Sequence, residues 1–433
     1  MELALPIATS PLSGTVEVPG DKSLAHRAML FAALAEGDSE VSRYPDSGVT
    51  RAMRGALASL GVPSTLENGV LRVHGNGWRP FPNSGATAYC GNSATTFRLL
   101  AGALAGTGSA ATLDGSAGLR RRPMNRIVDP LRAMGAKVTA AEGVAADGRT
   151  VACAPLVFTP SPLKGFEYDL SVASAQVLSC LELAALGAEG NSRFTVPGPV
   201  RDHTERMLEA MGVEISPDSV MPLTGRRLKP LKGTLAGDIS SAAFLLAAAA
   251  IVPGSEITIR EVGVNPTRTG VLDVLRRMGA KITLSNEHGQ LGEKVADVTL
   301  KAAPLTGVEV SGDIVVRAID EFPALAAVFA FAEGTSTVRD ARELRYKETD
   351  RIAAIVAQLR ALGAEAEELE DGFRVHGGTL RGGRTSANGD HRLAMAMAVC
   401  ALRAPVIVEG AEILAESFPE FEDTLRKLCD TLR

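Results

Sequence analysis

The sequence predicts an α/β protein of two domains, each built from three repeats of helices and strands. The chain has 433 residues, about twice what one hydrophobic core usually organises. Apolar and amphipathic helical segments alternate six times along it, and successive apolar segments start roughly 65 to 85 residues apart. A period of that length accommodates one buried helix, one amphipathic helix and several strands. Six such units in two domains make three per domain.

The six apolar segments are rich in alanine and leucine, and each opens with polar residues and leads into a turn and a β-rich stretch. They are DKSLAHRAMLFAALAEG from Asp21, GNSATTFRLLAGALAG from Gly91, ASAQVLSCLELAALGAEG from Ala173, GDISSAAFLLAAAAIVPG from Gly237, AIDEFPALAAVFAFAEG from Ala318 and GDHRLAMAMAVCALRA from Gly389. A helix that is apolar nearly all round does not face solvent. We therefore expect these helices to form the cores of the two domains.

The amphipathic segments end in a glycine turn and then re-enter a strand. They read LASLGVP, LRAMGAKV, LEAMGVEI, LRRMGAKI and LRALGAEA, and the sixth copy is the C-terminal LRKLCDTLR, with no strand after it. Glycine after the last helical turn is the expected C-cap, because it takes positive φ without penalty.

Composition and charge exclude several classes of function. The net charge of -5, the pI near 5.8 and the 4% aromatic content argue against bulk binding to nucleic acid. The five scattered cysteines form no CxxC pair, which argues against a disulfide framework or a zinc site. The chain opens without a basic-then-apolar signal, and its most apolar stretch, Ala242 to Val252, is too short to span a bilayer. We expect a cytoplasmic protein that binds neither nucleic acid nor membrane.

Polar residues at the start of every apolar helix indicate an anion site. A helix N-terminus presents unpaired N–H groups and roughly half a positive charge. For any single helix these residues can be ordinary caps, but all six helices have them, and three add a lysine, arginine or histidine. If the buried helices share a direction, their N-termini emerge on one face of each domain, and a crevice between the two faces would bind anions.

Three clusters hold residues that suit such chemistry. Lys22, Ser23 and Arg27 open the first helix, where they suit a phosphate or carboxylate. Arg122 ends an arginine run before Pro123, which stiffens the loop and can aim a bidentate guanidinium.

The third cluster lies in the second half of the chain. Glu348 stands next to Lys347 in RELRYKETDR and can exchange a proton at a pKa that its neighbours set, although such a charge run can also be a salt-bridged helix surface. Asp320 opens the fifth apolar helix, so it should stay ionised and can act as a base, and His391 and Arg392 open the sixth. GxSxG, Walker A and GxGxxG motifs are absent.

These motifs in this order resemble the 5-enolpyruvylshikimate-3-phosphate synthases of the enolpyruvyl transferase family. The resemblance runs through PGDKSLAHR, GNSATTFR, GLRRRPM, ASAQ, RDHTERM, GDISSAAF, NPTRTG, IDEFP, YKETDR, GDHR and SFPEF, and so covers essentially the whole chain. It implies an inside-out α/β barrel of two domains, each with three βαβαββ units around buried parallel helices. The implied domains are residues 20–235 and residues 236–433 plus the N-terminal strand 1–19, with the active site in the interdomain cleft.

The resemblance also implies the substrates and their contacts. Shikimate 3-phosphate is expected at Lys22, Ser23, Arg27, Ser174, Ala175, Gln176, Arg201, Asp320 and Lys347. Phosphoenolpyruvate is expected at Lys22, Asn92, Ala94, Arg122, Gln176, Arg351, His391 and Arg392, supported by the loop up to Thr95. The two substrates bring about six negative charges together, each pair costing roughly 4 kcal/mol at 4 Å and an effective dielectric of 20. Such a site needs several cations, and these residues include them.

The implied reaction is an addition followed by an elimination that releases phosphate, in aromatic amino-acid biosynthesis. Glu348 is the candidate proton donor to the methylene carbon of phosphoenolpyruvate, with Lys22 assisting, and Asp320 is the base for the 5-hydroxyl. No metal or cofactor is expected, because fixed cations and helix ends stabilise the charge. A monomer is expected, and domain closure should expel water.

Some positions depart from the family pattern. Ala94 replaces a usual glycine and Leu99 a usual proline, which resembles the class II, glyphosate-tolerant branch. The Ala94 methyl is expected to narrow the phosphoenolpyruvate pocket against the longer inhibitor. Glu416 stands where a lysine is usual, and an acidic pair is missing or shifted at Ser47-Gly48-Val49, so no contact is assigned at either place.

Three alternatives compete with this interpretation. The sister enzyme that transfers enolpyruvate to UDP-N-acetylglucosamine typically has Lys-Asn in place of Lys22-Ser23, and a cysteine in the arginine loop. The chain has no cysteine between Cys90 and Cys153. A non-catalytic anion-binding repeat protein would be favoured by loss of Lys22, Asp320 or Glu348, and all three are present. A nucleic-acid end-processing enzyme is disfavoured by the acidic charge and the scarce aromatic residues.

Overall fold

The computed structural model describes residues 1–144 and 148–429, and its backbone contacts divide the chain into two units. The N-terminal unit consists of Gly20–Leu235 and Gln290–Glu293, and the C-terminal unit of Met1–Pro19, Ala236–Gly289 and Lys294–Arg433. Both units combine helices with sheets, so the α/β class predicted from the sequence is confirmed. Of the sixth amphipathic segment, residues 430–433 lie outside the described residues.

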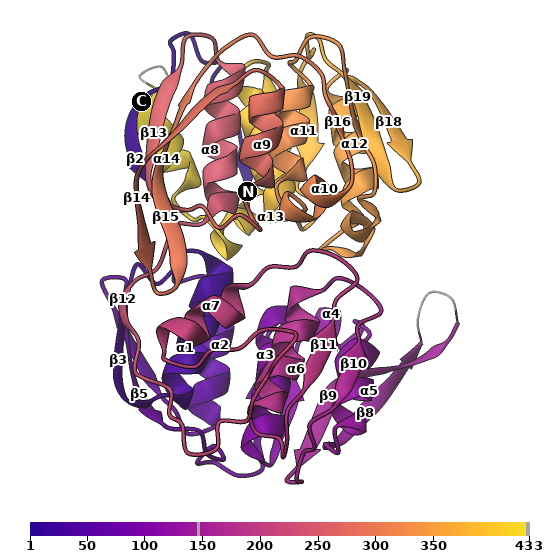
Figure 1. Ribbon diagram of the computed structural model, residues 1–433. Coiled ribbons are helices and arrows are strands. Elements are labelled where there is room, and N and C mark those ends of the chain that lie inside the picture. Colours follow the sequence, from indigo (N-terminus) through magenta and orange to yellow (C-terminus); the bar gives the residue numbers. More distant parts are fainter. Residues whose placement is uncertain (145–147, 430–433) are drawn as a thin grey trace. The chain divides into compact units, whose positions relative to one another are not determined.

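The N-terminal unit surrounds three buried helices with sheets and outer helices (Figure 1). The buried helices are α1 (Lys22–Leu34), α3 (Ala94–Thr107) and α6 (Ala175–Ala185). The outer ones are α2 (Gly48–Ser59), the short α4 (Ala117–Arg120), α5 (Asn125–Ala133) and α7 (His203–Ala210). The strands are β3 (Glu36–Ser42), β4 (Ser64–Glu67), β5 (Val70–Asn76), β6 (Ala86–Tyr89), β7 (Ala111–Asp114), β8 (Lys137–Val144), β9 (Thr150–Thr159), β10 (Glu167–Asp169), β11 (Arg193–Thr195) and β12 (Lys232–Thr234). They form sheets of order β12-β3-β5-β4, β6-β7-β9-β8 and β10-β11.

The C-terminal unit repeats this plan. Its buried helices are α8 (Ile239–Ile251), α11 (Phe322–Phe329) and α13 (His391–Ala401), and its other helices are α9 (Gly270–Arg277), α10 (Asp313–Arg317), η1 (Arg342–Tyr346), α12 (Arg351–Ala361), η2 (Ala411–Glu416) and α14 (Phe421–Leu428). The strands are β1 (Glu2–Leu3), β2 (Ser13–Glu17), β13 (Glu256–Gly263), β14 (Lys281–Gln290), β15 (Glu293–Lys301), β16 (Glu309–Val310), β17 (Thr335–Val338), β18 (Glu365–Leu369), β19 (Gly372–His376), β20 (Gly383–Ser386) and β21 (Val406–Glu409). They form sheets of order β1-β21-β20, β14-β15-β13-β2 and β16-β17-β19-β18.

The six apolar segments form the six buried helices, as their all-round apolar character predicts. Every residue of α8 is buried, and α1 is buried from Leu24 to Leu34. The glycines that follow the outer helices have positive φ, for example 102° at Gly135 and 111° at Gly279, as expected for C-caps. Within residues 1–144 and 148–429, no helix combines the length and apolar character needed to cross a bilayer.

Two repeats exchange their first strands, which explains why the chain passes from the C-terminal to the N-terminal unit after Pro19 and back after Leu235. Helices α3, α6, α11 and α13 each lie between two strands that pair in parallel, such as β6 and β7. Strand β2 precedes α1 in sequence but pairs in parallel with β13, and β12 precedes α8 but pairs in parallel with β3. The N-terminal strand β2 therefore completes a sheet of the C-terminal unit.

The third repeat differs from its predicted pattern. The sequence predicts a strand after LEAMG, but residues 213–222 form only the isolated bridges Ser192–Val220 and Ser216–Ser219. Pro217 lies between Ser216 and Ser219, and Pro222 follows Val220 by two residues. Proline has no N–H to donate and so interrupts a ladder, which explains why the prediction of a continuous strand is wrong here.

Candidate active site

Two glycines of α3 lie against the backbone of α6. A Cβ atom at Gly102 would lie 2.1 Å from the Cys180 carbonyl oxygen, and one at Gly106 would lie 2.3 Å from the Leu183 carbonyl oxygen. Only glycine permits this backbone approach. The two helices therefore pack closely, and the residues at their N-termini can touch.

Gln176 connects these two first turns. Its Nε2 donates to Thr95 Oγ1 at 2.8 Å, and its Oε1 accepts a hydrogen bond from Arg98 Nη1. Both amide atoms are thus committed to α3, which fixes the orientation of the side chain. The half-buried Arg98 is a cation that the sequence analysis did not single out. The sequence feature that could have identified it is a single arginine in an apolar helix, because a buried charge requires a polar partner.

Arg27 connects α1 with α6 and α7 from a buried position. Its side chain donates from Nε to Thr204 Oγ1 at 2.8 Å, from Nη2 to Ser179 Oγ at 3.0 Å and from Nη1 to the Ser23 carbonyl at 3.1 Å. Burial lowers the pKa of Arg27, but an arginine guanidinium remains a cation at neutral pH. Because these three acceptors are uncharged, they orient the guanidinium without neutralising it.

The other predicted residues of this unit lie at helix starts and turns. Lys22 and Ser23 form the first turn of α1, and Ser174 is the N-cap of α6, where its side chain makes no cap hydrogen bond. Ala175 is the first residue of α6, and Arg201 lies just ahead of α7.

The arginine run divides between two roles. Arg120 forms an ion pair with Asp114, Nε to Oδ1 at 2.8 Å, and it is exposed. Arg122 is half-buried in the turn after α4. Asn92 accepts a hydrogen bond from Ser116 Oγ at 3.0 Å, which ties the loop before α3 to the start of α4. The loop that carries Ala94 and the helix that leads to Arg122 are therefore joined.

In the C-terminal unit, Arg351 is the centre of a buried charge cluster. The side chain is only 1% exposed; its Nε lies 2.7 Å from Asp390 Oδ2, its Nη2 lies 2.6 Å from Glu348 Oε2, and its Nη1 lies 3.5 Å from Asp320 Oδ1. Three carboxylates thus surround one guanidinium. Arg351, expected at phosphoenolpyruvate, is covered by protein groups in this structure.

Two cations at the edge of this cluster are more accessible. Lys347 Nζ donates to Asp320 Oδ1 at 3.1 Å with its side chain 28% exposed. Arg392 Nη1 donates to the Asp320 carbonyl at 2.9 Å. The structure therefore brings Asp320, Lys347, Glu348, Arg351 and Arg392 together, and His391 opens the same helix as Arg392.

The cluster decides the protonation state of Glu348. Burial raises its pKa, but the charges of Arg351, His391 and Lys347 outweigh burial and lower the pKa to about 2. Glu348 is thus ionised at neutral pH, and its side chain is still 39% exposed. It must first bind a proton before it can donate one.

Arg268, in the NPTRTG motif, is a second residue that the sequence analysis left without a role. Its buried Nη2 donates to Ser240 Oγ at 2.9 Å and lies 3.7 Å from Asp238 Oδ1 and 3.6 Å from Glu321 Oε1. Asp238 is the N-cap of α8 and Glu321 that of α11. Arg268 therefore joins two of the three helix N-termini in this unit, and Arg392, 3.9 Å from Glu321, joins the third.

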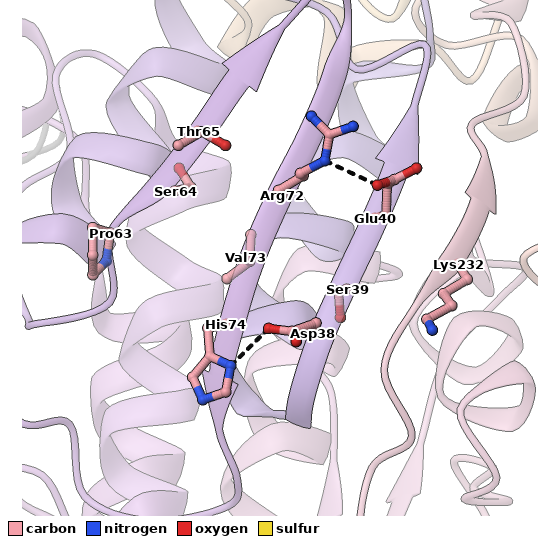
Figure 2. Close-up of a pocket in the computed structure, with 10 residues that line it drawn as sticks. All are labelled: Asp38, Ser39, Glu40, Pro63, Ser64, Thr65, Arg72, Val73, His74 and Lys232. Carbon is pink, nitrogen blue, oxygen red and sulfur yellow. Dashed lines mark hydrogen bonds and ion pairs between the residues drawn. The ribbon is translucent and has the colours of Figure 1, made fainter.

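A groove of about 460 Å³ on the N-terminal unit lies away from these residues (Figure 2). It runs over the outer face of the β12-β3-β5-β4 sheet, where Asp38 pairs with His74 at 2.7 Å and Glu40 with Arg72 at 2.9 Å. These residues stand opposite each other in the strand register, so the charges satisfy one another across the strands. None of the predicted site residues lines the groove. We therefore interpret it as a solvated sheet face, where substitutions can serve as controls for variants of the candidate site.

Comparison with known proteins identifies the family of the chain. A family model described as EPSP synthase (3-phosphoshikimate 1-carboxyvinyltransferase) matches residues 7–425. A relative of that enzyme name from Syntrophotalea carbinolica is 47% identical over 416 residues, covering 95% of each chain, and one from Syntrophomonas wolfei is 43% identical over 427 residues, covering 97% of this chain and 98% of the relative.

Solved structures give the same result. EPSP synthase from Acinetobacter baumannii superposes with a TM-score of 0.88 at 37% identity, covering 99% of this chain and 98% of that one. The enolpyruvyl transferase NikO from Streptomyces tendae, with a TM-score of 0.74 at 19% identity over 99% and 97% of the chains, shares the fold. The chain belongs to the EPSP synthase (3-phosphoshikimate 1-carboxyvinyltransferase) family.

Proposed function

We propose that the chain transfers the enolpyruvyl group of phosphoenolpyruvate to the 5-hydroxyl of shikimate 3-phosphate and releases phosphate, in aromatic amino-acid biosynthesis. The observation that supports this most strongly is the cluster of Asp320, Lys347, Glu348 and Arg351, which holds two carboxylates beside fixed cations. An addition–elimination on an anionic substrate needs this combination of a proton donor, a base and compensating charge.

Shikimate 3-phosphate is proposed to bind chiefly to the N-terminal unit. Lys22 and Ser23 in the first turn of α1 and Ser174 at the start of α6 offer a cation and hydroxyl groups at helix N-termini, which suit a phosphate. Arg27 keeps its positive charge behind them, because its three hydrogen-bond acceptors are uncharged. Ala175, Gln176 and Arg201 complete this set.

Phosphoenolpyruvate is proposed to contact both units. The loop of Asn92 and Ala94, together with Lys22, Arg122 and Gln176, would meet it from the N-terminal unit. Lys347 and Arg392 would meet it from the C-terminal unit, with Arg351 and His391 next to them. We propose that both sets serve one active site, because the residues expected at phosphoenolpyruvate come from both units.

The reaction is proposed to proceed in two steps. A proton is added to the methylene carbon of phosphoenolpyruvate, and the 5-hydroxyl oxygen, which gives its proton to Asp320, bonds to the neighbouring cationic carbon. The new methyl group then returns a proton to the Glu348 carboxylate while the C–O bond to phosphate breaks, which restores the vinyl group and releases phosphate. The product keeps the enolpyruvyl group as an ether.

Glu348 is proposed to be the proton donor, with Lys22 assisting, and the charge cluster explains how it can take up a proton. Arg351, His391 and Lys347 hold its pKa near 2. An arriving phosphoenolpyruvate anion would offset part of that positive charge and raise the pKa of Glu348. Proton uptake is then coupled to substrate binding.

The chain is proposed to act as a cytoplasmic monomer with these two small-molecule substrates and no metal or cofactor. The experiment that tests the reaction measures phosphate release from phosphoenolpyruvate with shikimate 3-phosphate or UDP-N-acetylglucosamine as acceptor. Release only with the shikimate ester is expected. Release only with the nucleotide sugar would replace the acceptor, and no release with either would refute the enzymatic function.

A further inference from the structure

His26 joins the first turn of α1 to the N-cap of α3. The ring is buried, at 3% exposure. Its Nδ1 lies 2.5 Å from the Lys22 carbonyl oxygen, and its Nε2 lies 3.2 Å from Ser93 Oγ. Lys22 is expected to contact both substrates, while Ser93 stands between Asn92 and Ala94, which are expected at phosphoenolpyruvate.

The partners determine where the protons are. A carbonyl oxygen only accepts, so Nδ1 carries the hydrogen and donates it to Lys22. Burial, more than any other cause, lowers the pKa of His26 to about 4, so at neutral pH the ring is uncharged and Nε2 accepts from the Ser93 hydroxyl. Ser93 Oγ in turn accepts from the Thr96 N–H at 3.2 Å and from the Thr96 hydroxyl at 2.9 Å. Every donor in this chain of hydrogen bonds thus has an acceptor.

We infer that His26 is a positioning residue. Through the Ser93 hydroxyl, it fixes the position of the Asn92–Ala94 loop relative to the first turn of α1, which carries Lys22. This inference rests on the proposed function, because it concerns the binding of phosphoenolpyruvate. The bridge to Ser93 is the part that matters for the loop, whereas the bond to Lys22 lies within α1.

Two substitutions separate these two bonds. The side-chain amide nitrogen of asparagine replaces Nδ1, so His26→Asn keeps the bond to Lys22 and loses the bond to Ser93. The side-chain amide of glutamine reaches the position of Nε2, so His26→Gln keeps the bond to Ser93 and loses the bond to Lys22. Both variants remove the imidazole, so a difference in their kinetics reports the contribution of the hydrogen bond to Ser93.

Steady-state kinetics test the inference. His26→Asn is expected to raise KM for phosphoenolpyruvate by roughly three- to tenfold, the effect of one lost hydrogen bond, with KM for shikimate 3-phosphate unchanged. His26→Gln is expected to stay within about twofold of wild type for both substrates. Equal behaviour of the two variants, or a parallel rise in both KM values, would overturn the inference.

A control and a second measurement keep the test decisive. Thr107→Val deletes a buried hydroxyl at the other end of α3, where Oγ1 donates to the Ala103 carbonyl at 2.7 Å, and it should leave both KM values unchanged. If His26→Asn does not fold, nitrogen-15 NMR of the wild type gives the answer. The spectrum is expected to show that Nδ1 of His26 is protonated and Nε2 is not. The Nε2 resonance is expected to shift in Ser93→Ala. The opposite tautomer would contradict the hydrogen bond from Ser93 to Nε2. Failure of the proposed function is distinguishable, because the wild type would then release no phosphate while the tautomer result still stands.

Discussion

The buried ring of His26 should make the stability of the N-terminal unit depend on pH. Burial, followed by the charges of Arg27 and Lys22, lowers its pKa from 6.5 to about 4, against the raising effects of Asp21 and of the Lys22 carbonyl bond. Between these two pKa values the unfolded chain binds a proton that the folded chain does not. Stability is therefore full above about pH 6.5 and falls as the pH is lowered toward 4. From pH 7 to pH 5 the loss is about 2 kcal/mol, at 1.36 kcal/mol per pKa unit.

Urea unfolding of wild type and His26→Gln at the two pH values measures this loss. Trp78, the single tryptophan of the chain, lies in the same unit, so its fluorescence reports the relevant transition. Other groups titrate too, and the difference between the two proteins isolates His26. That difference should shrink by about 2 kcal/mol from pH 7 to pH 5. Parallel pH dependence of wild type and His26→Gln would refute the reasoning.

Three further predictions follow from other parts of the two units. Ala94→Gly should strengthen inhibition by glyphosate by about tenfold or more, since one missing methyl in a tight pocket changes discrimination by roughly 1–3 kcal/mol; an unchanged inhibition constant would contradict the role of the methyl. Asp390→Asn keeps an N-cap residue but removes the charge that pairs with the buried Arg351. Unfolding followed by far-UV circular dichroism should show a loss of about 3 kcal/mol in unfolding free energy. An unchanged unfolding free energy would contradict the stabilising role of this ion pair. Burial raises the pKa of Glu182 well above its usual value, so protonated Glu182 stabilises the fold at low pH and this contribution is lost as the pH rises. Glu182→Gln should therefore be more stable than wild type at pH 8 and lose this advantage toward pH 4. A difference in unfolding free energy that stays constant with pH would refute this prediction.

Local patterns were sufficient to predict most of the architecture. All-round apolar character identified the six buried helices, and a glycine identified the end of five outer helices, because both signals arise within a few residues of sequence. The polar openers proved to be caps in part, since Asp21 and Asp390 accept hydrogen bonds from backbone N–H groups of their own helices. The exchange of β2 and β12 between repeats has no such local signal. It was implied by the family resemblance and not by the residues themselves.

The interactions of the candidate site could be predicted less well, because they depend on contacts across long sequence distances. Arg98 and Arg268 gain their partners from other helices, 78 and 28 residues away at Gln176 and Ser240. The ionised state of Glu348 depends on charges that only the folded unit brings near. The sequence does show that Arg98 lies within an apolar helix and therefore requires a buried partner, but it does not identify that partner.

The central claim is that residues of both units act in one reaction, and single-turnover phosphate release tests it most directly. Lys22→Met removes a cation from the N-terminal unit, and Glu348→Gln removes the proposed proton donor from the C-terminal unit. Lys232→Met and Glu40→Gln, both in the groove of Figure 2, are the matched controls. Each site variant should release phosphate at least about 100-fold more slowly than wild type, and each control at the wild-type rate. Wild-type release by either folded site variant would show that one unit suffices and would contradict the account.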